Sequence, residues 1–124
     1  MSRAPVTFVN VRNGEWLCRR ALVADKFWLR LRGLLGRESL QKGEGLYITP
    51  CTAVHMVGMG YAIDAIFLDK DKVVVGIEEN LQPGKFSRFF CAARGCLELP
   101  AGTAGVTDTR VGDKLEMKIL LAEA

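Results

Sequence analysis

Apolar and polar residues follow one another in short runs along most of the chain, which predicts β-strands joined by tight turns. The runs richest in β-forming residues predict strands at residues 6–11, 15–23, 45–49, 61–68, 73–77 and 96–99. A last strand follows Gly112-Asp113, and its apolar residues Leu115, Met117, Ile119 and Leu121 share one face. The pairs Asn13-Gly14 and Pro83-Gly84 and the polar run 69–72 predict turns between strands.

One segment has helical instead of strand spacing. Asp25 is suited to cap a helix, and Gly36 to end it. Between them, apolar residues three and four apart line one face: Phe27, Trp28, Leu31, Leu34 and Leu35. Residues 101–107 have room for one small helical turn. We therefore predict a mainly β fold, a small β-sandwich or barrel-like domain with one amphipathic helix packed beside it. Without repeats or linkers, residues 1–124 are expected to form a single globular domain.

Composition and charge narrow the class of protein. The 124 residues are 49% apolar and 25% charged, as in an ordinary globular protein, and the net charge of +3 does not imply a nucleic-acid partner. No apolar run reaches the roughly 20 residues that span a bilayer, and the N-terminal region lacks an uninterrupted apolar stretch. We expect a cytoplasmic protein without a transmembrane segment, whose four cysteines are reduced; two disulfides remain an alternative for an exported protein.

Several blocks in fixed order carry a family likeness. They are Arg32-Gly33-Leu34-Leu35-Gly36-Arg37, Gly43-Glu44-Gly45-Leu46, Val54-His55-Met56-Val57-Gly58-Met59, Ile63-Asp64-Ala65-Ile66-Phe67-Leu68-Asp69, Leu97-Glu98-Leu99-Pro100-Ala101-Gly102 and Gly112-Asp113. In order and spacing the chain resembles Domain of Unknown Function family 192 over roughly residues 15–117. The resemblance implies a compact prokaryotic β domain with a helix beside it, and no established activity. It points to the branch with Cys51 and His55 in a central block, although Gly60 stands where a basic residue is usual.

The central block gathers soft and borderline metal ligands. Cys51, His55, Met56 and Met59 supply a thiol, an imidazole and two thioethers, which suit Cu(I) or Zn²⁺, and Cys91 and Cys96 are a possible second pair. Zinc ligands usually come in tight pairs, however, and these two groups lie far apart in the sequence. The same residue types are common in protein cores. We therefore favour packing and expect neither a metal nor another cofactor.

Asp64 is the most unusual single residue, because it lies within the apolar run 61–68. A buried carboxylate must be paired or hydrogen-bonded. The favoured prediction is an ion pair that ties the helix to this strand, with Arg30, Arg32 or Arg37 as the partner. The alternative is a carboxylate beside His55 that acts as an acid or a base.

The basic stretch from Arg19 to Arg37 predicts a solvated face, and nucleic acid is not an expected partner because aromatic residues are not interleaved with its cations. The sequence has no phosphate-binding glycine loop and no nucleophile-elbow serine.

The function is thus not fixed by the sequence, which favours a non-enzymatic accessory domain that binds a small ligand or a protein partner. The candidate binding residues are Cys51, His55, Met59, Asp64, Arg32 and Arg37. The alternative is a metal-dependent or hydrolase-like enzyme that uses His55 with Asp64 or Cys51, and a third hypothesis is an interaction module with an exposed strand edge.

Overall fold

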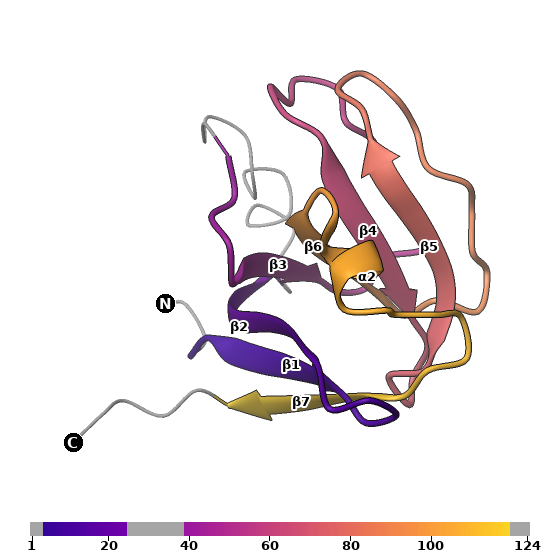
Figure 1. The fold of residues 1–124 in the computed structure, drawn as a ribbon. Helices are drawn as coiled ribbons and strands as arrows, with labels where there is room; N and C mark the ends of the chain where they lie inside the picture. Colours follow the sequence, from indigo (N-terminus) through magenta and orange to yellow (C-terminus); the bar gives the residue numbers. More distant parts are fainter. Residues whose placement is uncertain (1–3, 25–38, 120–124) are drawn as a thin grey trace.

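The computed structural model describes residues 4–24 and 39–119, which form seven strands and one short helix (Figure 1). The predicted helix at 25–36 lies outside the described residues. The elements are β1 (Val6–Asn10), β2 (Trp16–Ala24), β3 (Glu44–Ile48), β4 (Ile63–Leu68), β5 (Val74–Leu81), β6 (Gly95–Pro100), α2 (Thr103–Val106) and β7 (Leu115–Ile119). Within these two segments we find no helix with the length and apolar character needed to cross a membrane.

The strands form a single curled sheet in the order β5-β4-β6-β3-β2-β1-β7. The β2–β3 pair is parallel, and the other pairs of this sheet are antiparallel. The sheet curls far enough for its two edge strands to meet at one end, where Val73 and Lys114 form a bridge. The Val74 N–H also donates to the Asp113 carbonyl at 2.8 Å. The predicted mainly β fold is confirmed, and of the two alternatives it is the barrel-like one.

Each face of the sheet carries its own apolar core, because side chains alternate along a strand. The inner core draws on every strand and on α2, with Phe8, Tyr47, Leu97 and Leu99 among its members. The outer core draws on β2, β3, β4 and β6 and includes Met56 and Phe67. Loops pack against this outer core through residues such as Val54 and Phe90. The inner face is therefore covered by the sheet's own curl, and the outer face by connecting segments.

The turns behave as their residue types predict. Between β1 and β2, Asn10 and Glu15 are joined by a backbone hydrogen bond of 2.8 Å, and Gly14 adopts a positive φ of 74°. Between β4 and β5, one Asp69 oxygen accepts the N–H groups of Asp71 and Val73 at 2.8 and 2.9 Å. The predicted small helical turn is confirmed as α2.

Most strands match their predicted extents to within one or two residues, and β5 and β7 differ from the prediction in more than this. The strand predicted at 73–77 continues to Leu81, because Leu81 still pairs with Ile63 beyond a register shift. The apolar face predicted for the last strand is buried only at its start. Leu115 is 1% exposed, whereas Ile119 is 66% exposed. The reason is topological, since β7 is an edge strand that meets β5 only beside Lys114.

Candidate functional site

Two long loops run beside each other along the outer side of β4, from its start, where β5 ends, to its last residue, Leu68, whose carbonyl accepts the Arg94 N–H (Figure 1). We call residues 49–62 and 82–94 the loop platform. Backbone hydrogen bonds of 2.8–2.9 Å run from Phe90 to Thr52, from Ser87 to Val54, and from Met56 to Lys85. This ladder fixes the two loops against each other, so the side chains they present are held in place without a regular strand.

His55 occupies the middle of this ladder, in an isolated bridge with Phe86. The imidazole is exposed and lies against the Phe86 ring, with 6.1 Å between the ring centroids. Its Nδ1 accepts the Val57 N–H at 3.3 Å, which places the proton of the neutral ring on Nε2. His55 therefore presents an aromatic face and one outward donor.

The other large apolar side chains of the platform divide between the core and the solvent. Phe90 stacks on Phe67 in the outer core, with 4.6 Å between the ring centroids. Val57, Phe86 and Phe89 are 53%, 71% and 69% exposed. Sequence reasoning missed both exposed phenylalanines, although the interleaved run Phe86-Ser87-Arg88-Phe89 is a visible signal for an exposed aromatic segment.

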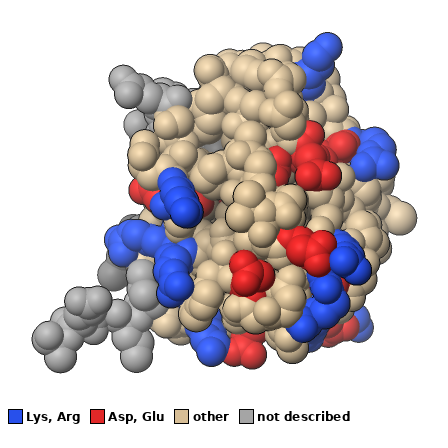
Figure 2. All heavy atoms as spheres, viewed as in Figure 1, with Lys and Arg blue, Asp and Glu red and all other residues tan. Residues whose placement is uncertain are grey.

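The platform also contains few charged residues. Residues 49–62 contain no Asp, Glu, Lys or Arg, and residues 82–94 contain Lys85, Arg88 and Arg94 but no Asp or Glu. Figure 2 shows the same contrast on one face, where charged side chains gather over the lower part and the upper part is mostly uncharged. Arg88 is engaged by Glu78 on β5 at 3.3 Å. The platform is thus apolar with a positive balance.

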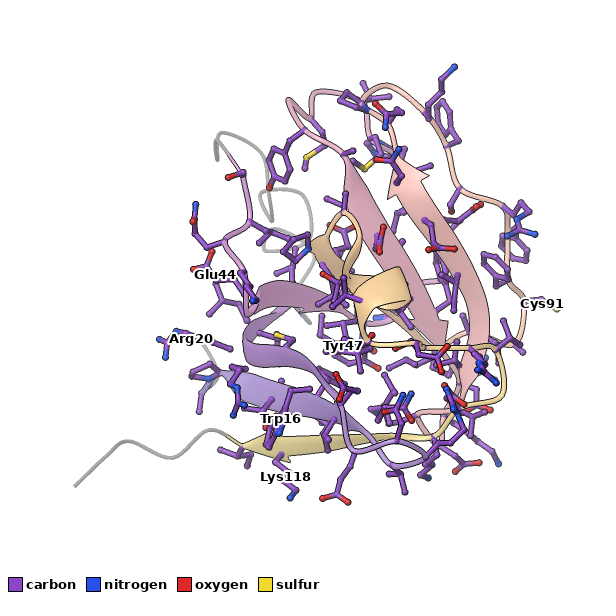
Figure 3. The ribbon with its side chains drawn as sticks, viewed as in Figure 1. Trp16, Arg20, Glu44, Tyr47, Cys91 and Lys118 are labelled. Carbon is purple, nitrogen blue, oxygen red and sulfur yellow. The ribbon has the colours of Figure 1, made fainter. Side chains whose placement is uncertain are left out.

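The remaining soft-ligand residues of the central block pack against the core. Met56 is buried in the outer core, and Cys51 and Met59 are packed against it. Among residues 4–24 and 39–119 no group of three or more His, Cys, Asp or Glu side chains is arranged to hold a metal ion. Of the predicted second cysteine pair, the structure brings Cys96 to Cys51 and leaves Cys91 exposed at the outside of the molecule (Figure 3).

Cys96 and Glu98 lie beneath Cys51 on the outer face of β6. Burial and then the hydrogen bond with Cys51 raise the pKa of the Cys96 thiol well above its usual value. Glu98 is 6% exposed and makes no hydrogen bond or ion pair with the residues the structure describes. Burial, and secondarily the negative charge of the Cys51 thiolate, raise the pKa of Glu98 to about 8. At neutral pH this carboxyl is mainly protonated, which avoids a bare charge in the core.

Asp64 lies on the opposite face of the sheet from this cluster. It alternates with Ile63 and Ala65 of the outer core and is fully buried. Its Oδ1 accepts the Asn80 N–H at 2.8 Å, and its Oδ2 accepts the N–H groups of Gly102 and Ala104 at 3.1 and 2.8 Å. The carboxylate therefore joins β4, the end of β5 and α2, and is not brought together with His55.

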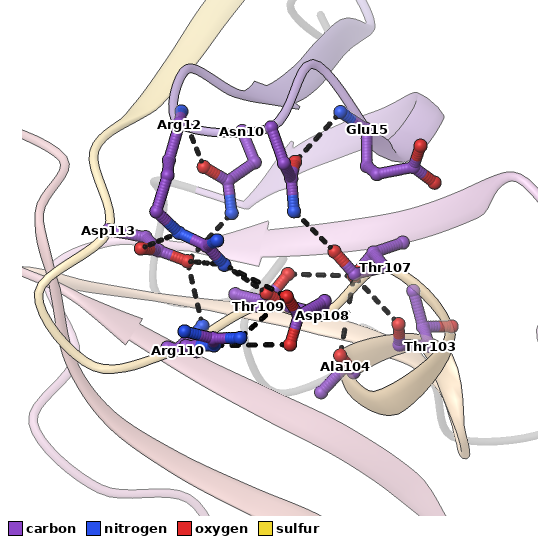
Figure 4. A network of polar contacts seen from close by, with 11 residues as sticks. Asn10, Arg12, Glu15, Thr103, Ala104, Thr107, Asp108, Thr109, Arg110 and Asp113 are labelled. Carbon is purple, nitrogen blue, oxygen red and sulfur yellow. Dashed lines mark hydrogen bonds and ion pairs between the residues drawn. The ribbon is translucent and has the colours of Figure 1, made fainter.

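The two arginines of the predicted site, Arg32 and Arg37, lie outside the described residues, as does Arg30. A buried aspartate that does meet an arginine is Asp113, in the network that closes the sheet (Figure 4). Arg12 Nε donates to it at 2.7 Å, and Asn10 donates at 2.8 Å. These bonds, with Arg12 contributing most, lower the pKa of Asp113 to about 2. The network is structural, and it explains the Gly112-Asp113 pair.

Known proteins with a similar sequence or structure support the fold described above. The model of the family DUF192, described as "Uncharacterized ACR", matches residues 8–117. A UPF0127 protein of Thermococcus sibiricus is 27% identical over 116 residues, which are 90% of this chain and 74% of that protein.

Two crystal structures are similar at 24% identity. A protein of unknown function from Novosphingobium aromaticivorans has a TM-score of 0.75 over 90% of this chain and 83% of its own. A protein described as a putative transcription regulator, from Sinorhizobium meliloti, has a TM-score of 0.77 over 92% of each chain. These two similarities show a shared fold.

Proposed function

Because the chain belongs to DUF192, a family of unknown function, we propose its role from its own geometry: a non-enzymatic domain that binds a peptide segment of a protein partner on the loop platform. The observation that carries this proposal is the exposure of Phe86 and Phe89, at 71% and 69%, on loops held by backbone hydrogen bonds. An exposed aromatic pair on a fixed backbone is typical of binding surfaces more than of solvent-facing loops.

The energetics favour binding at this place. A buried phenylalanine removes about 150–250 Å² from water, and a contact of this size contributes much of the binding free energy at an interface. Since the ladder already fixes Val54, His55 and Met56 against the facing loop, little backbone entropy is lost when a partner docks.

The charged residues of the platform indicate the chemistry of the partner. Lys85 and Arg94 are exposed, and the two loops contain no acidic residue to oppose them. A peptide with apolar side chains for the phenylalanines and acidic side chains for the cations matches this surface best. His55 Nε2 adds one donor, suited to a backbone or carboxylate oxygen of such a peptide.

The enzyme alternative receives less support. Asp64 has both oxygens occupied by backbone N–H groups on the inner face, while His55 is exposed on the platform. A general acid or base must reach the same reacting atom as its partner group. The small-ligand alternative is likewise less favoured, since exposed loops offer a broad surface for a peptide.

The proposal is tested by selecting random peptides on the immobilised full chain, with counter-selection on the double variant Phe86→Ser/Phe89→Ser. We expect selected peptides to combine apolar with acidic residues and to bind the double variant roughly tenfold or more weakly. Val106→Ser is the matched control, because Val106 is 83% exposed but lies on α2. Selected peptides without acidic residues, or equal binding to the double variant, would contradict the proposal.

A labelled oligothymidylate provides the second arm. The proposal expects no binding at moderate salt. If the oligonucleotide bound, with an affinity that fell steeply with salt and was lost in Lys85→Glu, the platform would be a nucleic-acid surface and the peptide proposal would be wrong.

A further inference from the structure

The chain after β3 folds back over the start of β6. Ile48, the last residue of β3, pairs with Cys96. Three residues further on, the Cys51 N–H donates to the Arg94 carbonyl at 3.1 Å, and the Thr49 hydroxyl donates to the same oxygen at 3.1 Å. One backbone and one side-chain hydrogen bond to the Arg94 carbonyl therefore hold the segment that carries Cys51 beside the start of β6.

The two thiols meet at this point. Cys96 hydrogen-bonds with Cys51 through its side chain, and both pack in the outer core. Both are thiols in the structure. Cys51 is half-buried and thus open to a small reagent, whereas Cys96 is fully buried behind it. Exchange chemistry requires this arrangement, in which one thiol meets the reagent and a second lies within reach of the first.

The remaining cysteines do not share this setting. Cys18 belongs to the inner core, where burial raises its pKa to about 11. Cys91 is exposed on the loop platform. The contact between Cys51 and Cys96 is therefore not a general property of the cysteines in this chain.

We propose that Cys51 and Cys96 are a thiol–disulfide exchange site that takes a low-molecular-weight disulfide such as oxidised glutathione. The Cys51 thiolate attacks one sulfur of glutathione disulfide, so that a Cys51–glutathione bond forms and one glutathione leaves. The Cys96 thiolate then attacks the Cys51 sulfur and releases the second glutathione. The two protein thiols lose two electrons, glutathione disulfide gains them, and the two thiol protons end on the released glutathiones. This site goes beyond the peptide-binding function and does not depend on it.

Glu98 is an acidic neighbour of the second thiol. It follows Cys96 by two residues on the same face of β6, and its ionised form raises the pKa of Cys96 in addition to the larger effects of burial and of Cys51. Because Cys96 is fully buried and burial raises its pKa most, we expect the second step to be slower than the first, so that the Cys51–glutathione adduct accumulates before the protein disulfide does.

The test incubates the full chain with glutathione disulfide, quenches it in acid, alkylates the remaining thiols under denaturing conditions and maps peptides by mass spectrometry. We expect a product lighter by two hydrogen atoms, with a Cys51–Cys96 linkage that dithiothreitol removes. Cys96→Ser is expected to stop at the Cys51–glutathione adduct, and Cys51→Ser to form neither product. The matched control Cys91→Ser should still form the linkage.

The proposal is overturned if Cys51 and Cys96 of the wild-type chain stay open to alkylation under conditions that modify Cys91, or if the linkage joins a different pair. The peptide map of the wild-type chain distinguishes these outcomes even where a serine variant folds poorly. Glu98→Gln adds a kinetic readout above pH 8, where the ionised Glu98 raises the pKa of Cys96 and its removal should speed conversion of the adduct. An unchanged rate would remove Glu98 from the second step. Loss of peptide binding in the Phe86/Phe89 variant leaves all these readouts in place.

Discussion

Asp64 and Glu98 are buried carboxyl groups on opposite faces of the same curled sheet, and their surroundings differ sharply. Asp64 accepts three backbone N–H groups from Asn80, Gly102 and Ala104. Glu98 makes no hydrogen bond or ion pair with any described residue, and burial raises its pKa to about 8. The first is a structural junction, and the second is a carboxyl that is buried mainly in its protonated form at neutral pH.

The difference follows from how each face is covered. The inner face is closed by the curl of the sheet and by α2, so its polar groups find partners in ordered backbone. The outer face is covered by loops, and there the structure places two thiols in contact, a buried carboxyl with a raised pKa and the exposed aromatics of the platform. Buried titratable groups and exposed aromatic side chains thus gather on the outer face, which is therefore the face where we expect function.

The largest expected effect comes from removing the satisfied carboxylate. Asp64→Ala leaves three N–H groups without acceptors in a fully buried place, so we expect the free energy of unfolding to fall by about 3–5 kcal/mol. Urea unfolding followed by circular dichroism measures this. Asp71→Ala, in the exposed turn before β5, is the control and should change stability by less than about 0.5 kcal/mol. A loss as small as the control's would mean that the junction at Asp64 is not structural.

Glu98, in contrast to Asp64, is expected to affect the free energy of unfolding through its dependence on pH. Its pKa is about 8 in the fold against 4.5 ordinarily, so the folded state holds a proton that the unfolded state has released between these values. Stability from this group is full below pH 4.5 and is lost as pH rises towards 8. Wild-type protein should lose about 3 kcal/mol from Glu98 between pH 4.5 and 7, and Glu98→Gln should lack this component.

The measurement for Glu98 is the difference between wild-type and variant unfolding free energies across that pH range. Glu116→Gln, an exposed carboxyl on β7 paired with Lys118, is the matched control and should follow the wild-type curve. Parallel curves for wild type and Glu98→Gln would show that Glu98 ionises normally in the fold, and the contrast with Asp64 would disappear.

The sequence predicted the strands, the Asn13-Gly14 hairpin and the barrel-like class, because these follow from local alternation and turn chemistry. It singled out Asp64 correctly as a buried carboxylate that needs partners, but the backbone N–H groups that it meets leave no mark in a sequence. The arginines predicted as its partners lie outside the described residues. Glu98 escaped notice because one polar residue between Leu97 and Leu99 looks like ordinary alternation. Only the pairing of β6 with strands on both sides shows that both of its faces are buried.

The smallest expected effect concerns a third buried carboxylate, Asp113, which extends the comparison between Asp64 and Glu98. Arg12 is the main cause of its lowered pKa of about 2, so this group stabilises the fold above pH 3.8 and the contribution is lost as pH falls through 2. Arg12→Ala removes that charge but leaves the Asn10 side chain and the Arg110 N–H as donors. Because Arg12 is itself partly exposed and solvent screens its charge, we expect a small loss of stability at neutral pH and a smaller further loss on acidification.

Arg110→Ala is the control for this last prediction, because its guanidinium pairs with the exposed Asp108 while only its backbone N–H reaches Asp113. Acid titration of the wild type, Arg12→Ala and Arg110→Ala, followed by circular dichroism, measures the order of their stabilities. If Arg110→Ala lost as much stability as Arg12→Ala, the exposed ion pairs would be holding the closure of the sheet, and not the buried carboxylate. If only Arg12→Ala is affected, hydrogen-bonded buried carboxylates account for the inner face and its seam, and Glu98 differs from them as the buried carboxyl whose pKa is raised.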